Sequence, residues 1–280
     1  MDNKKKKTVY LLLLSISVLL LILLALLPGK TGEKKAVIRE KEAITEKKDP
    51  VYSPEIDSVV GLHKSKKEAQ DAEPEKKAGI TGELYIIIDD VGYNMHQIDP
   101  FLDLSFPITF SVLPSLPHTR ETAKKIIDSN QEIMLHLPME PINGEDPGPG
   151  AIYAEMDDEE VLSLLRQHLN QLPEIQAVNN HMGSLITGKT DIMSVVLKEL
   201  SQRGLVFIDS LTTPDSVVKD MSSKYGMKYF PRTVFLDNSG DPEKIKNAFT
   251  EGKLRAKENG KAVLIGHIWS NTLPSVLREM

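Results

Sequence analysis

"YIIIDDVG", residues 85–92, runs from a short apolar segment directly into two adjacent aspartates. An uninterrupted apolar run of this length is typical of a strand that is buried on both faces, as in a parallel sheet. Two carboxylates at the end of such a strand are costly to bury unless a partner compensates their charge. The stretch therefore predicts a buried parallel strand whose end carries functional groups.

Short apolar runs alternate with amphipathic helical stretches from residue 83 to the end of the chain. Alternating strands and helices predict a parallel sheet. About seven such units in roughly 200 residues favour an α/β fold of the distorted or incomplete (β/α) barrel type over a smaller flavodoxin-like sheet. The expected strands are residues 84–88, 108–113, 132–137, 176–180, 205–209, 228–236 and 262–268.

The N-terminal residues 1–28 have the pattern of a signal anchor. Lys4 to Lys7 form a basic block, and residues 9–27 then carry no charge over about 19 residues, close to the length of a membrane span. No A-x-A cleavage pattern follows, which favours an uncleaved transmembrane segment over a cleaved signal peptide. We therefore expect a single-pass protein of the cell membrane with its C-terminal domain extracytoplasmic. Cleavage of the segment would make the protein secreted.

Residues 29–80 are rich in charged side chains and poor in aromatics, which predicts a flexible linker before a catalytic domain at residues 81–280. The chain has no cysteine, so a metal would be held by histidine and carboxylate side chains. The net charge of −6 gives no support for nucleic-acid binding.

Polar residues stand at the ends of five of the expected strands. In a parallel β/α fold these carboxyl ends converge on one face, where active sites are built. Two histidines and one aspartate suit a divalent metal with open positions, while a further carboxylate and histidine can serve as base and acid. The strand-end residues are Asp89, Asp90, His136, Asn180, His181, Asp209 and His267.

These stretches together resemble the divergent branch of the polysaccharide deacetylases, over nearly everything from Leu84 to the C-terminus. The resemblance implies a distorted β/α barrel and metal-dependent removal of acetyl groups from cell-envelope polysaccharides. It is carried by "IIIDDVG", "ITFSVLP", "EIMLHLPMEP", "VNNHMGSLIT", "FLDN" and "VLIGHIW".

The resemblance implies a metal site in which Asp90 and His136 are ligands. The family's second motif has two histidines four residues apart, but here the second position holds Glu140. His181 in "NNHMGS" is therefore the expected third ligand, with Glu140 as the fallback. The expected cofactor is a divalent metal, with zinc as the first choice.

The resemblance also implies the catalytic groups. Asp89 matches the family's base, and His267 in "LIGHI" matches its acid. We expect Asp209 in "FIDS" to orient His267. The Arg- and Pro-rich motif of ordinary members is absent, which leaves a second possibility open: a non-catalytic module that binds glycans or organises the envelope on the same fold.

Two further features bear on the substrate, expected to be a polysaccharide or oligosaccharide. The Pro- and Gly-rich segment 140–155 is long for a loop in a compact fold, as lids and substrate-binding elements often are. Trp269, the only tryptophan, follows His267 by two residues and would stack on a sugar ring or pack in the core.

Overall fold

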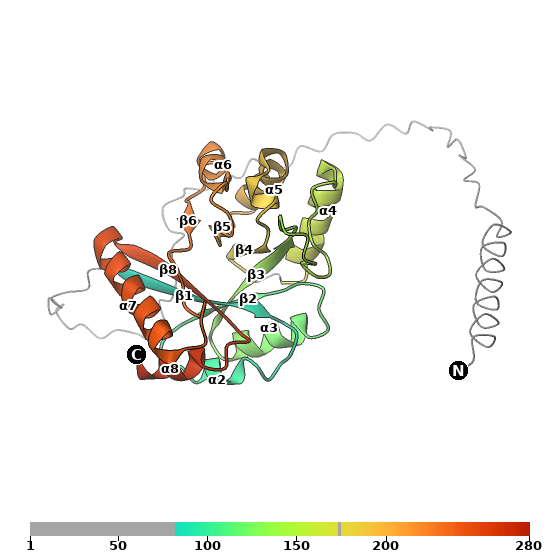
Figure 1. Cartoon of the computed structure of the whole chain (residues 1–280). Helices are drawn as coiled ribbons and strands as arrows, with labels where there is room; N and C mark the ends of the chain where they lie inside the picture. Colours follow the sequence, from blue (N-terminus) through green and yellow to red (C-terminus); the bar gives the residue numbers. More distant parts are fainter. Residues whose placement is uncertain (1–81, 173–174) are drawn as a thin grey trace, which may run out of the picture. The chain divides into compact units, whose positions relative to one another are not determined.

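The computed structural model describes residues 82–172 and 175–280 (Figure 1). In this part of the chain, eight parallel strands form one sheet in the order β6-β5-β4-β3-β2-β1-β8-β7. The predicted signal anchor and linker lie outside the described residues. Within the described ranges, no helix is long and apolar enough to cross a membrane.

The elements follow the alternation expected from the sequence. The strands are β1 (Glu83–Val91), β2 (Thr109–Val112), β3 (Glu132–Met139), β4 (Ala177–Met182), β5 (Val206–Asp209), β6 (Phe230–Pro231), β7 (Val234–Phe235) and β8 (Lys261–His267). The helices are α2 (Asp99–Leu102), α3 (Thr119–Asp128), α4 (Asp158–Leu169), the short 3₁₀ helix η1 (Ile186–Gly188), α5 (Thr190–Gln202), α6 (Val218–Lys224), α7 (Pro242–Asn259) and α8 (Leu273–Glu279).

The expected strand at residues 228–236 is two strands rather than one. β6 pairs with β5, whereas β7 pairs with β8 at the other edge of the sheet. Only Arg232 and Thr233 separate β6 from β7. The Cα atoms of Pro231 and Val234, on the two edge strands, are therefore at most three Cα–Cα steps apart, about 11 Å. The sheet is therefore rolled into an incomplete barrel.

The chain itself crosses the gap between the two edges. The backbone N–H of Arg232 donates to the carbonyl of Asp209 on β5 (2.8 Å), and that of Thr233 donates to the carbonyl of Val263 on β8 (2.7 Å). Two neighbouring residues thus bind β5 and β8, the strands next to the two edge strands at opposite ends of the sheet. Residues 232 and 233 take the place of a direct strand pair between β6 and β7.

The rolled sheet separates an inner from an outer apolar layer. A small inner cluster of Ile87, Met134, Val263 and Ile265 fills the barrel. The larger core lies between the outer face and the helices, which surround the strands in Figure 1. Side chains alternate between faces with a period of two, so the residues two positions beyond the inner cluster also point inward. These residues are Asp89, His136 and His267.

His168 on α4 anchors the long segment that follows β3. It is fully buried, and its Nε2–H donates to the carbonyl of Gly150 (2.7 Å). Its Nδ1 is buried and has no hydrogen-bond partner among the described residues. Burial lowers the pKa of His168 even though the contact with Gly150 opposes the shift.

This environment predicts a loss of stability in mild acid. Because the folded-state pKa lies below the unfolded value, His168 contributes stability that is fully present above about pH 6.5. That stability is lost as the pH falls from there towards the folded-state pKa, by about 1.4 kcal/mol per pH unit at most. Thermal melts from pH 7.5 to 5 should show this slope in the wild type, and a smaller one in His168→Gln, which keeps a donor for Gly150 but does not titrate. Equal slopes would contradict it.

Candidate metal centre and its surroundings

A kink at the end of β1 brings both adjacent aspartates to the same site. The register with β2 shifts between Ile88 and Val91, and Asp90 has φ = 64°. Aspartate tolerates this left-handed conformation better than most residues. Asp89 stays in register with His267 on β8. The bulge redirects the Asp90 side chain, which regular alternation would place on the opposite face of the sheet, towards the same site. Regular strand geometry would have separated the two carboxylates.

Asp90, His136 and His181 form a cluster whose ligand atoms all lie within 4.8 Å of one another. Oδ1 of Asp90 lies 3.1 Å from Nε2 of His136 and 2.9 Å from Nδ1 of His181. The two ring nitrogens are 3.2 Å apart. The three side chains come from β1, β3 and β4, so the structure brings together the three expected ligands.

A tight turn places His181 in this cluster. His181 pairs in register with Pro138 near the end of β3, and the chain then turns through Met182 and Gly183, both with positive φ. A Cβ on Gly183 would lie 2.8 Å from the Cβ of Met139, so a larger residue has no room at this point. The glycine therefore allows β4 to end directly beside β3.

Asn179 lies fully buried beneath the cluster. Its Nδ2 donates to Asp89 at Oδ1 (2.9 Å) and Oδ2 (3.2 Å). Its Oδ1 lies 2.7 Å from Nδ1 of His136 and accepts a second hydrogen bond from Ser111 Oγ (2.5 Å). With Nδ1–H donating to Asn179, a neutral His136 would keep its Nε2 lone pair for a metal, in place of the hydrogen bond to Asp90.

Trp269 belongs to the site rather than to the core. Its Nε1–H donates to Oδ2 of Asp90 (2.8 Å), and its ring stacks on the His267 ring at a centroid distance of 4.8 Å. The side chain is nevertheless 54% exposed. One oxygen of Asp90 is thus held by the indole, which leaves the other directed at the two histidines.

Asp237, and not Asp209, orients His267. Oδ1 of Asp237 accepts from Nδ1 of His267 (2.9 Å), and Oδ2 accepts from the His267 backbone N–H (2.8 Å). Asp209 instead accepts hydrogen bonds from the Leu211 backbone N–H and the Ser216 hydroxyl. The expectation for Asp209 is wrong because its short strand β5 ends in a turn that uses the carboxylate locally. The signal for Asp237 was present in "FLDN", two residues after β7.

Glu140 holds the loop and stands outside the cluster. Its Oε2 accepts from the backbone N–H of Ala154 (2.7 Å). This contact joins the two ends of the 140–155 segment. It gives the carboxylate of Glu140 a structural role that requires no metal. Ser184 also binds this segment, because its Oγ accepts from the backbone N–H of Ile142 (2.9 Å).

The two adjacent aspartates have opposite pKa shifts. Burial raises the pKa of Asp89, an effect only partly offset by His136. Burial also acts on Asp90, but hydrogen bonds with His136 and His181 outweigh it and lower the pKa of Asp90 far below its usual range. Neighbouring carboxylates whose environments separate their pKa values are typical of sites with different roles for each.

The pKa values of two histidines next to these carboxylates are raised. Burial alone would lower the pKa of His136, but Asp89 and Asp90 outweigh it and raise the value. Burial likewise opposes charge on His267, and the hydrogen bond with Asp237 raises its pKa despite it. The buried carboxylate of Asp89 and the imidazole of His267 thus stand on paired strands, β1 and β8, in register with each other.

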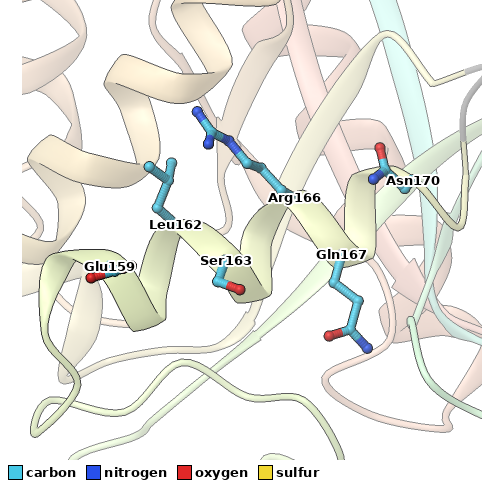
Figure 2. Close-up of a pocket in the computed structure, with 6 residues that line it drawn as sticks. All are labelled: Glu159, Leu162, Ser163, Arg166, Gln167 and Asn170. Atoms are coloured by element: carbon cyan, nitrogen blue, oxygen red, sulfur yellow. The ribbon is translucent and has the colours of Figure 1, made fainter. Parts of the chain in front are cut away.

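A separate pocket runs along the outer face of α4 (Figure 2). Its arginine, Arg166, forms a bidentate ion pair with Glu199 of α5, at 2.9 Å for both contacts. None of the metal-centre residues lines it, and its arginine is already paired with Glu199. We therefore place the functional site at the strand ends. The pocket is lined by Glu159, Leu162, Ser163, Arg166, Gln167 and Asn170.

The fold and site together define an incomplete β/α barrel with an Asp-His-His cluster at the carboxyl ends of its strands. The chain belongs to the divergent polysaccharide deacetylase family, which it matches over residues 86–280. This membership confirms the resemblance seen in the sequence.

Among the proteins similar to the chain are two curated relatives and a solved structure. The uncharacterized protein YibQ of Escherichia coli K12 is 34% identical over 201 residues, which span 72% of this chain and 63% of YibQ. An uncharacterized protein of Haemophilus influenzae is 27% identical over 190 residues, 68% of each chain. The uncharacterized protein ATU2773 of Agrobacterium tumefaciens C58 has a TM-score of 0.64 at 19% identity, covering 74% of this chain and 85% of that one. This last likeness shows the fold.

Proposed function

We propose that the protein is a metal-dependent hydrolase that removes acetyl groups from a cell-envelope carbohydrate. The observation that carries the proposal is the arrangement around Asp90, His136 and His181: a metal-binding cluster flanked by the buried carboxylate of Asp89 and the oriented imidazole of His267. Family membership supports a carbohydrate substrate. A carboxylate and an imidazole beside open metal positions are what amide or ester hydrolysis needs.

The donor set fits a divalent metal, with zinc as the proposed ion. Asp90, His136 and His181 would hold it through one oxygen and two nitrogens, the ligand types that zinc prefers in catalytic sites. Asn179 and Trp269 hold His136 and Asp90 from behind, as is usual for metal ligands. A divalent ion bound there would act as a Lewis acid on an acyl oxygen and acidify a water molecule.

The proposed roles of the protein's own groups follow from their contacts. Asp89, held by Asn179, would accept the proton of the attacking water at a carboxylate oxygen. In His267, Nδ1–H is committed to Asp237, so Nε2 would carry the proton that goes to the leaving group. The exposed indole of Trp269 would stack on a sugar ring beside the acetyl group.

The proposed site of action is the cell envelope. The uncharged run at residues 9–27, preceded by Lys4 to Lys7, would anchor the chain in the cell membrane and leave the barrel outside. Fractionation of cells tests this proposal: the full-length protein should stay with the membranes, and release of a form that begins near Lys30 would show cleavage instead.

Replacing Asp237 with asparagine is expected to reduce turnover by about 10-fold or more without loss of metal. Asparagine keeps an acceptor for His267 but removes the charge that stabilises its protonated ring. Acetate release and zinc content should be measured on the same preparation. The matched variant is Asp209→Asn, which changes the aspartate of β5 and should leave the rate per folded molecule near the wild-type value. If Asp209→Asn slows turnover and Asp237→Asn does not, Asp209 rather than Asp237 orients His267.

Acetate release tests the function itself. The full-length protein, purified in detergent and loaded with zinc, should release acetate from at least one of three acetylated glycans: chitin oligosaccharides, acetylxylan or peptidoglycan. The Asp89→Asn variant is the background. A glycan-binding module would retain these polymers on an affinity column without releasing acetate from any of them, and that result would favour the non-catalytic alternative.

A further inference from the structure

The side chain of Asn179 contacts both a proposed metal ligand, His136, and the proposed base, Asp89. Its amide nitrogen donates to both oxygens of Asp89, and its amide oxygen faces Nδ1 of His136 at 2.7 Å. We propose that Asn179 is a positioning residue that couples the metal ligand His136 to the base Asp89. This role rests on the proposed function and adds a residue that takes no direct part in the reaction.

With Asp89 ionised, as a general base must be, the contacts permit only one orientation of the amide. An ionised carboxylate only accepts hydrogen bonds, so the NH₂ group must face Asp89. The oxygen then faces His136, which fixes the hydrogen of that ring on Nδ1 and leaves the Nε2 lone pair for a metal. Ser111 Oγ donates to the same oxygen at 2.5 Å and keeps the amide from turning over.

No other side chain of this size does both tasks. Aspartate in place of Asn179 would keep an acceptor for His136 but would set a second carboxylate against Asp89. Leucine would fill the space and offer neither group. The two substitutions therefore separate the contact with the metal ligand from the contact with the base.

The next residue provides a matched control. Asn180 is equally buried, but it points to the opposite face of β4 and serves the backbone. Its Oδ1 accepts from the Ser210 backbone N–H (2.9 Å), and its Nδ2 donates to the Met182 carbonyl (2.7 Å). Asn180 thus has the same chemistry and burial as Asn179, but its side chain holds the Met182 turn that follows His181 and contacts neither His136 nor Asp89.

Zinc affinity tests the contact with His136. Trp269 is the only tryptophan of the chain and is hydrogen-bonded to Asp90, so its fluorescence reports zinc binding in the full-length protein. Asn179→Leu should weaken zinc binding by about 10- to 100-fold, whereas Asn179→Asp should bind within about 3-fold of the wild type. Asn180→Leu loosens the turn after His181 but leaves the contact between Asn179 and His136 in place, so it should lower the melting temperature and weaken zinc binding by much less than Asn179→Leu. Wild-type affinity in Asn179→Leu would overturn the proposal, as would an equal loss in Asn180→Leu.

A double-mutant cycle tests the contact with Asp89 without any need for turnover. Asn179→Asp alone should lower the melting temperature, because two carboxylates then face each other across a 2.9 Å contact. Adding Asp89→Asn should restore much of that loss, since an amide at position 89 can donate to a carboxylate at position 179. Additive losses in the double variant would contradict the coupling.

These readouts separate this proposal from the proposed function. A wild-type protein that binds zinc but releases no acetate would overturn the deacetylase activity. The affinity series and the melting temperatures would still decide whether Asn179 couples His136 to Asp89. If zinc does not bind to the wild type, both proposals fail.

Discussion

Zinc binding is expected to fall by more than about 100-fold when His136 is replaced with alanine, because a site with three protein ligands cannot lose one and keep the ion. Alanine at Asp90 or His181 should have a similar effect, since the ligand atoms of all three residues lie within 4.8 Å of one another. Zinc per protein chain, measured by elemental analysis after dialysis, checks the prediction. Fluorescence of Trp269 should report the same loss.

Glu140→Gln is the matched control for these variants. Glu140 occupies the position of the family's second histidine, but its carboxylate accepts from the Ala154 backbone N–H. Its replacement should therefore leave the zinc content close to that of the wild type. Loss of zinc in Glu140→Gln, with retention in His181→Ala, would reverse the ligand assignment.

Asp89→Asn should leave zinc bound and slow acetate release by about 100-fold or more, because the amide cannot accept the proton of the attacking water. Asp89 lies outside the cluster of ligand atoms and both of its oxygens accept from Asn179, so we propose it as the acceptor rather than as a ligand. The rate should be measured with saturating glycan on protein of known zinc content. His267→Ala should show the same combination, owing to loss of the proton donor. Full activity in Asp89→Asn would refute the proposed base.

The sequence was sufficient to predict the parallel α/β architecture and the residues that meet at its strand ends. Asp90, His136 and His181 were candidates because each stands at or near the end of an expected strand, and the family resemblance then singled them out as ligands. The count of strands was wrong by one, since residues 228–236 cross from one edge of the sheet to the other. A two-residue strand has too little periodicity to reveal which neighbour it pairs with.

Local geometry accounts for what the sequence did not predict. The bulge at Asp90 depends on a positive φ that no residue pattern demands, yet it decides that both aspartates reach the site. The sequence does not distinguish Asp237 from Asp209 as the residue that orients His267, because both follow apolar strand residues. Only the pairing of β7 with β8 distinguishes them. The contact of Trp269 with Asp90 joins residues 179 positions apart, which no local pattern shows.

Restoration of activity by metal tests the central claim most directly. The full-length protein should be stripped with a chelator, dialysed, and titrated with zinc while acetate release from the best glycan substrate is followed. We predict that the rate falls to background on stripping and returns in proportion to zinc, with a break at one ion per chain. His136→Ala should not recover. An acetate release rate unaffected by stripping, or no release from a zinc-loaded protein on any acetylated glycan, would contradict a metal-dependent deacetylase.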